Sequence, residues 1–269
     1  MINIQKIIKY CAIAFALFLV FNIITTIMYG LISIGNIFTN ENKNDTTTEN
    51  ATLKEINNQI QILEIDIKTS NIIFKEDSKF KIETNNQKIK IKENNNKLTL
   101  VEEKPSLINN TNNNLIIYIP NEYNFDKVFI ENGAGKIQIH NIKTNQIELE
   151  LGAGKVNIEN IIVSSETKID GGAGEIIINN GNITNLDLNM GLGNLSLTAT
   201  LIGNSEIDAG IGNIKLNLKE NLDNYKIKIN EALGNATLNN EKMKSDTYYG
   251  NGYNIVNING GIGNITINS

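Results

Sequence analysis

The sequence has no arginine and no tryptophan, and its 269 residues include only one histidine and one cysteine. Arginine supplies the planar fork that binds phosphate in two places, so its absence and a net charge of -5 argue against a nucleic-acid partner. Cys11, which lies inside a hydrophobic run, is the only cysteine, so the chain can form neither an internal disulfide nor a cysteine metal cluster. The fold must therefore be held together by packing.

One long hydrophobic run lies near the N-terminus. No charged residue occurs from Tyr10 to Asn40, and about 20 apolar residues span a bilayer as a helix, so we expect a transmembrane helix within residues 1–38. Lys6 and Lys9 precede the run, which predicts a cytoplasmic N-terminus and an extracytoplasmic C-terminal domain. A cleaved signal peptide is the alternative, and it leads to the same compartment. Residues 39–55 are polar and predict a linker.

A Gly-x-Gly repeat fills residues 129–269. The second glycine of each unit recurs after 19, 20, 19, 19, 22 and 29 residues, which is the signature of a repeat architecture. We expect the chain to turn at these glycines, because glycine tolerates backbone conformations that other residues avoid. The predicted corner glycines are Gly135, Gly154, Gly174, Gly193, Gly212, Gly234 and Gly263.

Apolar residues alternate with polar ones within each unit, and the alternation changes phase at the second glycine. Alternation with a period of two predicts strands with one buried face. The change of phase predicts a bulge or corner that keeps the aliphatic side chains inside. On this pattern the residues expected to face inward before the corner include Leu149, Leu151, Ala153, Leu192, Ile211 and Ile262, and those after it include Val156 and Ile158.

The predicted fold is all-β, a single-stranded parallel β-solenoid with coils of about 19 residues, preceded by the transmembrane helix. One coil buries five or six aliphatic side chains, which cannot offset the entropy of ordering its backbone, so each coil must stack on those before and after it. Residues 56–269 form this extracytoplasmic domain, with 129–269 as the coils. Residues 56–128 are expected to form an irregular cap that contains the strand-like segments 62–67, 80–82, 89–91, 98–100 and 115–119.

Polar residues also recur at fixed places in the repeat. Asparagine follows the second glycine in the last four units, where its side chains can hydrogen-bond along the stack. A calcium-binding glycine repeat would need aspartate there, and no unit has one. The position two residues before the first glycine predicts a solvated polar column made of Glu131, Glu150, Asp170, Asn189, Asp208, Asn230 and Asn259.

The sequence offers little that supports catalysis. His140 has neither a second histidine nor a cysteine outside the hydrophobic run with which to form a metal site or a catalytic triad. Amides take three of the seven positions of the polar column, unlike the clustered acids of a glycan hydrolase. We therefore predict no enzyme, no catalytic or metal-binding residues and no cofactor. Tyr248, Tyr249 and Tyr253 form a local aromatic cluster that either contacts a partner or covers the end of the core.

Two segments and the repeat resemble a known family. Leu115–Pro120 is a strand that ends in proline, Val128–Ile139 contains the first Gly-x-Gly, and Gly-x-Gly-x-Ile-x-Ile coils follow. Over residues 56–269 the chain resembles the bacterial "putative adhesin" proteins of β-strand repeats, a domain of unknown function related to the toastrack-like domains of envelope-stress proteins. The resemblance implies a β-solenoid-like fold and a role in the cell envelope, and it carries over no catalytic residue.

These observations predict a membrane-anchored, extracytoplasmic, adhesin-like or envelope-associated binding protein. The alternative within the binding class is a sensing or partner domain of a cell-envelope stress response. The alternative from another class is a glycan-active solenoid enzyme. The expected partners are the membrane, through the N-terminal helix, and an unknown envelope protein or glycan.

Overall fold

The computed structural model describes residues 51–103, 113–230 and 233–269, all within the compact unit Thr48–Ser269. The predicted transmembrane helix and residues 39–50 of the predicted linker lie outside the described residues. The last part of that linker, Thr52–Glu55, is a strand, because its backbone pairs antiparallel with residues 81–84 at the edge of the sheet. In the described ranges, no helix is long and apolar enough to cross a membrane.

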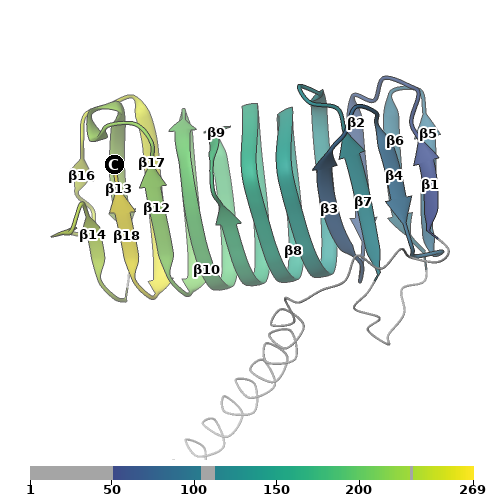
Figure 1. The fold of residues 1–269 in the computed structure, drawn as a ribbon. Coiled ribbons are helices and arrows are strands. Elements are labelled where there is room, and N and C mark those ends of the chain that lie inside the picture. Colours follow the sequence, from purple (N-terminus) through teal and green to yellow (C-terminus); the bar gives the residue numbers. More distant parts are fainter. Residues whose placement is uncertain (1–50, 104–112, 231–232) are drawn as a thin grey trace, which may run out of the picture. The chain divides into compact units, whose positions relative to one another are not determined.

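Strands make up almost all of the regular structure, as predicted for an all-β chain (Figure 1). The described part also contains a short 3-10 turn, η1 (Leu222–Asn224). The strands are β1 (Thr52–Glu55), β2 (Ile62–Ile67), β3 (Asn71–Glu76), β4 (Lys81–Thr84), β5 (Ile89–Asn94), β6 (Lys97–Glu102), β7 (Asn114–Ile119), β8 (Asn124–Ile178), β9 (Gly181–Thr184), β10 (Leu186–Ile202), β11 (Asn204–Ile211), β12 (Ile214–Leu218), β13 (Tyr225–Asn230), β14 (Ala236–Leu238), β15 (Glu241–Lys242), β16 (Tyr248–Tyr249), β17 (Asn254–Ile262) and β18 (Ile265–Asn268).

The coils stack in parallel and in register. Leu188 of β10 pairs with Ile169 of β8 on one side and with Ile207 of β11 on the other, so neighbouring coils are offset by one repeat. β8, with 55 residues, runs without a break through several coils, and β10, with 17, runs through most of one; both appear as curved rungs in Figure 1. The pairing places equivalent side chains directly above one another, which the regular spacing of the glycines predicted.

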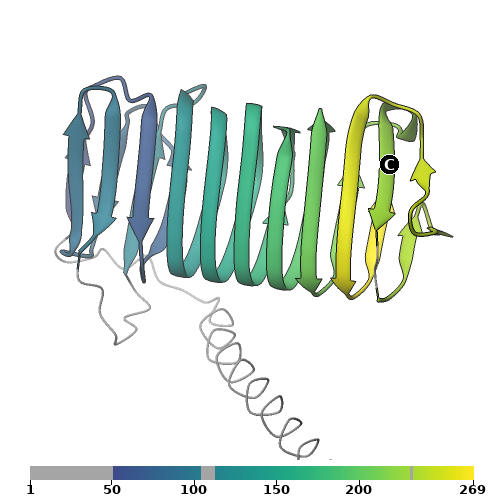
Figure 2. The ribbon, with the colours of Figure 1, turned by 180° about the vertical axis from the view of Figure 1, so that it is seen from behind.

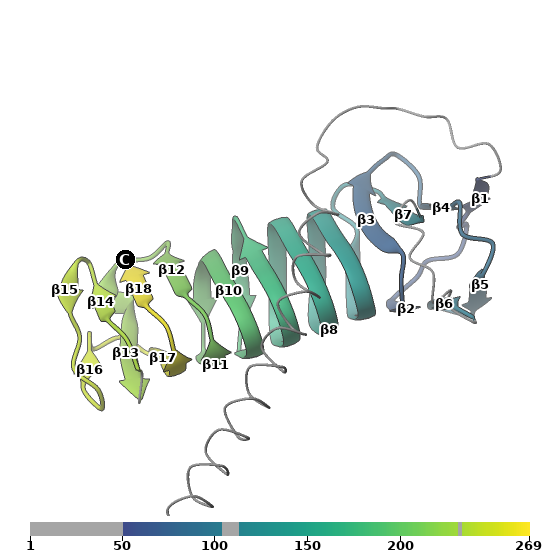
Figure 3. The ribbon, with the colours of Figure 1, turned by 90° about the horizontal axis from the view of Figure 1, so that it is seen from below.

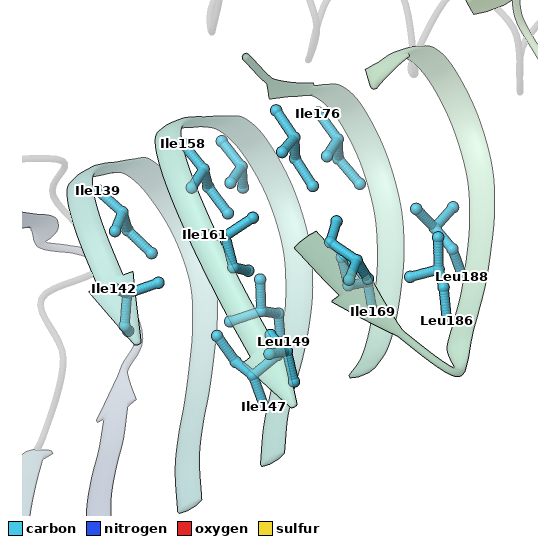
Figure 4. Close-up of a cluster of buried hydrophobic side chains, with 14 of the residues drawn as sticks. Ile139, Ile142, Ile147, Leu149, Ile158, Ile161, Ile169, Ile176, Leu186 and Leu188 are labelled. Atoms are coloured by element: carbon cyan, nitrogen blue, oxygen red, sulfur yellow. The ribbon is translucent and has the colours of Figure 1, made fainter. Parts of the chain in front are cut away.

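The core runs along the inside of the stack. In one coil Ile147 and Leu149 are buried before the Gly-x-Gly corner, and Val156 and Ile158 are buried after it, as the change of phase predicted. A second change of phase, missed in the sequence, turns Ile161 inward. Figure 4 shows these side chains pointing into the same interior from three segments of each coil. Each buried aliphatic side chain contributes roughly 1.5–3 kcal/mol, and the sum is shared between neighbouring coils.

The residue between the two glycines does not follow the predicted pattern. Ile211 and Ile262, expected inside, are 52% and 54% exposed, and Leu192 is only partly buried. The chain bends at the two glycines, so the residue between them lies on the outside of the bend. The equivalent residue Leu233, 73% exposed, continues the same line.

The last coil is out of sequence order, which corrects the prediction that every coil stacks on its sequence neighbours. β17 pairs in parallel with β11 on one side and with β13 on the other, and β18 lies in the same way between β12 and β14. The C-terminal coil is therefore inserted between the two coils that precede it in the sequence. Figures 1 and 2 show the yellow strands enclosed by green ones. Beyond β13 and β14, the short antiparallel strands β16 and β15 cover the end of the stack.

The N-terminal end is interleaved as well. β2 lies between β6 and the start of β8, and β3 lies between β7 and β8, all in parallel. The five segments predicted to be strand-like are strands, whereas β3 was missed and belongs to a regular coil rather than to an irregular cap. β5, β4 and β1 add antiparallel strands at this end, seen from below in Figure 3. Rings of Phe80, Tyr123 and Phe125 pack edge to face or tilted at this end of the core.

A buried carboxylate ties the N-terminal strands together. Glu102, 4% exposed, accepts hydrogen bonds of 2.7–2.8 Å from the backbone N–H groups of Lys68 and Thr69, from Thr69 Oγ1 and from Asn86 Nδ2. Burial raises the pKa of Glu102, but the hydrogen bonds lower it by more, so the pKa lies below its usual value of 4.5.

We expect Glu102→Gln to lower the free energy of unfolding by about 1–3 kcal/mol at neutral pH, because the amide presents a donor to groups that already donate. The native pKa is lowered, so the carboxylate stabilises the fold above pH 4.5 and loses this contribution as the pH falls through the native pKa. Denaturant unfolding of both proteins at several pH values should show the difference shrinking in acid. The exposed neighbour Glu103→Gln is the control, and a difference that stays constant with pH would contradict the prediction.

Candidate functional site

A groove of about 1170 Å³ runs across the coils beside the Gly-x-Gly corners. Each coil contributes a short segment that ends at the first glycine of its pair. We call this concavity the glycine groove. Its lining includes Glu150, Leu151 and Gly152 from one coil, and the equivalent residues Asp170–Gly172, Asn189–Gly191 and Asp208–Gly210 from the coils that follow.

The floor of the glycine groove is bare backbone because no side chain fits there. A Cβ atom built on Gly172 would overlap the carbonyl oxygen of Gly152, and one on Gly191 would approach the carbonyl oxygen of Gly172 at 2.6 Å. The same close approach recurs at the other first glycines of the stack, which are Gly133, Gly152, Gly210 and Gly261. The sequence motif therefore creates the groove by leaving one outward row of the sheet empty.

The predicted polar column lies along one side of the groove. Asn189 is in register with Asp170 and Asp208, and Asn259 is in register with Asp208 and Asn230. Asn189 Nδ2 donates to Asp170 Oδ1 at 3.1 Å. Asn230 Nδ2 donates to Asn259 Oδ1 at 2.9 Å, and Asn259 donates to Asp208. The amides thus form two hydrogen-bonded groups, one of Asn189 with Asp170 and one of Asn230, Asn259 and Asp208.

Two lysines neutralise part of the column. Lys168 Nζ lies 2.8 Å from Asp170 Oδ2, and this hydrogen bond lowers the pKa of Asp170 and raises that of Lys168. Lys68 contacts Glu131 and Asp66, which raises the pKa of Lys68. Within the described ranges, no lysine forms an ion pair with Glu150 or Asp208.

Most carboxylates of the column are held in place by groups of the same sheet. Among the residues that the structure describes, no group of three histidine, cysteine, aspartate or glutamate side chains is placed to hold a metal ion. The column residues point outward from a sheet, and neighbouring positions of the column are one strand, or about 4.8 Å, apart. Their hydrogen-bond partners are amides and lysines of the same sheet, which position them without leaving a general acid opposite a general base.

The predicted corner glycines lie at the bends. All seven have positive φ between 142° and 157°, values that side chains rarely adopt. At Gly193 and Gly212 an added Cβ would also overlap the carbonyl oxygen of the glycine one coil away. The asparagines after them form the expected ladder: the Asn213 N–H donates to Asn194 Oδ1 at 3.1 Å, and the Asn264 N–H donates to Asn213 Oδ1 at 3.1 Å.

A second asparagine ladder was missed in the sequence. Asn160 Nδ2 donates to Asn141 Oδ1 at 2.9 Å, and Asn180 Nδ2 donates to Asn160 Oδ1 at 2.8 Å. Lys219 Nζ extends the ladder by donating to Asn180 Oδ1 at 2.7 Å. The signal was present, because these asparagines recur after 19 and 20 residues at the second change of phase.

The three tyrosines have different surroundings. Tyr249 packs against the core, and its hydroxyl accepts a hydrogen bond of 2.8 Å from the Lys244 N–H. Tyr248 is 51% exposed, and Lys226 Nζ lies 4.4 Å from the centre of its ring. Tyr253 is 86% exposed. One tyrosine therefore covers the end of the core, and the other two are available for contact.

His140 lies outside the glycine groove. Its side chain is exposed and forms an ion pair with Glu159 of the next coil. Both residues line a smaller, open depression beside Phe74. His140 is thus a surface residue of the coil, as the sequence predicted.

The chain is similar to two solved structures and matches one family model. The chain is 15% identical to a "putative cell adhesion protein" from Clostridium sporogenes, over 81% of this chain and 98% of that one, with a TM-score of 0.37. It is 12% identical to a "putative adhesin" from Bacteroides fragilis, over 82% of this chain and 98% of that one, with a TM-score of 0.42. The comparison with curated proteins gives no match. The family model described as Toastrack DUF4097 matches residues 34–268, and the chain therefore belongs to that family.

Proposed function

We propose that this protein is a membrane-anchored, extracytoplasmic binding module that holds another envelope component against its stack of coils, in the manner of an adhesin and without catalysis. The observation that carries the proposal is the glycine groove, which continues from coil to coil and is lined by carboxylates, amides and bare backbone. A surface that repeats along one direction suits a long partner, because each coil offers it the same contacts.

The proposed location rests on the N-terminal sequence. The uncharged run from Tyr10 to Asn40 is long enough for one membrane span, and Lys6 and Lys9 favour a cytoplasmic N-terminus. The domain would then meet its partner outside the cell membrane. Protease added to intact cells should degrade the domain once it is unfolded by a destabilising substitution, and should spare a cytoplasmic control protein.

Crosslinking in intact cells tests the binding role. A photoreactive side chain at Asp208, in the glycine groove, should capture a second envelope component. The same group at Glu220 is the control, because Glu220 is an acidic residue on the surface of the coils but lies outside the lining of the groove. Equal capture from both positions, or none from Asp208, would refute the groove as the binding surface.

A further inference from the structure

The outward face beside the glycine groove is strongly acidic. Four coils present their first strand segments side by side, at residues 147–150, 167–170, 186–189 and 205–208. Alternate residues of these segments point inward and are buried, which leaves the charged ones outside. We call the outer surface of these segments the acidic face. It carries one lysine, Lys168, and the carboxylates Glu148, Glu150, Asp170, Asp187, Glu206 and Asp208.

Folding alone does not account for this arrangement. Asp187 and Glu206 are direct partners in the parallel register, and like charges placed opposite each other destabilise a sheet. Amides of the same sheet contact both carboxylates: Asn189 donates to Asp187 at 3.1 Å and Asn259 donates to Glu206 at 3.3 Å. On its other side Asp187 is in register with Lys168, whose Nζ lies 2.8 Å from Asp170 and 3.5 Å from Glu148 and forms no ion pair with Asp187. Among the described residues, the carboxylates of the acidic face that form no ion pair are Glu150, Asp187, Glu206 and Asp208, and three of these four lie on the two coils nearer the C-terminus.

The length and shape of the surface limit its occupant. Four adjacent strands extend roughly 15 Å between the outermost two, and an extended polypeptide covers that distance with about five residues. The glycine groove follows the same line and leaves room for a backbone beside the carboxylates. A flexible lysine side chain can reach successive carboxylates without matching the strand spacing.

We propose that the acidic face and the glycine groove together bind an extended, lysine-rich polypeptide segment that lies along the stack of coils. The segment places its ammonium groups against Asp187, Glu206, Asp208 and Glu150. The inference rests on the proposed binding function and specifies the chemistry of the partner.

Titration of the full-length chain in detergent with a labelled eight-residue peptide of alternating lysine and threonine tests this assignment, read by fluorescence anisotropy. We expect binding that weakens as salt rises, and an affinity about tenfold lower for Asp187→Asn/Glu206→Gln, since each exposed ion pair contributes modestly. The matched control Glu159→Gln/Glu220→Gln makes the same change of charge elsewhere on the coils and should alter affinity by less than about twofold.

Stability supplies a second readout. Asp187→Asn/Glu206→Gln should unfold at the same or a higher denaturant concentration than the parent, because a like-charge pair is removed. A loss of affinity therefore reflects the missing carboxylates and not unfolding. Equal losses in both double variants, or no binding to the parent, would overturn the proposal.

The two proposals fail in different ways. If the peptide does not bind while Asp208 still crosslinks an envelope component in cells, the partner chemistry is wrong and the binding function stands. If the peptide binds and no crosslink forms in cells, the acidic face binds basic peptides in solution, but the proposed envelope function is wrong.

Discussion

Gly212→Ala should lower the free energy of unfolding by about 3 kcal/mol or more, because the new methyl group meets two obstacles at once. The φ of Gly212 is +148°, which alanine adopts only with strain, and the added Cβ would overlap the carbonyl oxygen of Gly193 in the adjacent coil. Relief of the overlap requires the two coils to separate, which breaks the register on both sides of the corner. Thermal and denaturant unfolding measure the effect, and the melting temperature should fall by about 6–12 °C.

Gly171→Ala is the matched control. Gly171 is in register with Met190, which in turn is in register with Ala209, so larger side chains occupy the same position in the neighbouring coils. A Cβ on Gly171 would lie 3.1 Å from Ile176 Cδ1, the end of a flexible side chain that can shift. We expect the stability to change by less than about 1 kcal/mol. If both variants lost the same stability, close backbone approach at the corner would not explain the repeat.

Deletion of residues 254–269 should unfold more than the coil it removes. The inserted coil buries Val256, Ile258, Ile265 and Ile267, worth roughly 6–12 kcal/mol together, and it provides the sheet partner for both neighbouring coils. Without it, residues 225–238 lose their parallel pairing to the rest of the stack. Hydrogen exchange should therefore show loss of backbone protection across residues 225–238.

The deletion distinguishes between two possible stacking orders of the coils. A solenoid stacked in sequence order would lose only its last coil, and residues 225–238 would stay protected as the new end. The interleaved order predicts that protection retreats to about residue 218, and limited proteolysis should give a fragment that ends there. Full protection of residues 225–238 in the deletion variant would contradict the topology.

Much of the fold could be predicted from local patterns. Alternation at Ile147–Leu149 and Val156–Ile158 gave the buried face, and the spacing of the glycines gave the coil, because each depends on residues close in the chain. The position of β17 between β11 and β13 could not be predicted, since the repeat is the same wherever a coil is inserted. The longer spacing before Gly263 was the one local sign of the detour.

The candidate site was predicted only in part. The polar column followed from equivalent positions in the repeat, and the structure places Asp170, Asn189 and Asp208 side by side. The glycine groove was missed, because a groove made by absent side chains has no residue of its own to notice. Ile211 and Ile262 were assigned to the wrong side, since hydrophobicity alone does not tell the inside of a bend from its outside.

The inserted C-terminal coil also bears on how the protein is made. Beyond the interleaved N-terminal strands, a chain that emerges from its N-terminus can add coils one at a time from β8 to β12, but the slot beside β11 and β12 closes only when β17 and β18 arrive. A product that stops early is left with unpaired strand edges, which attract other chains and proteases. The order of the coils thus makes the arrival of β17 and β18 a condition for a sealed domain.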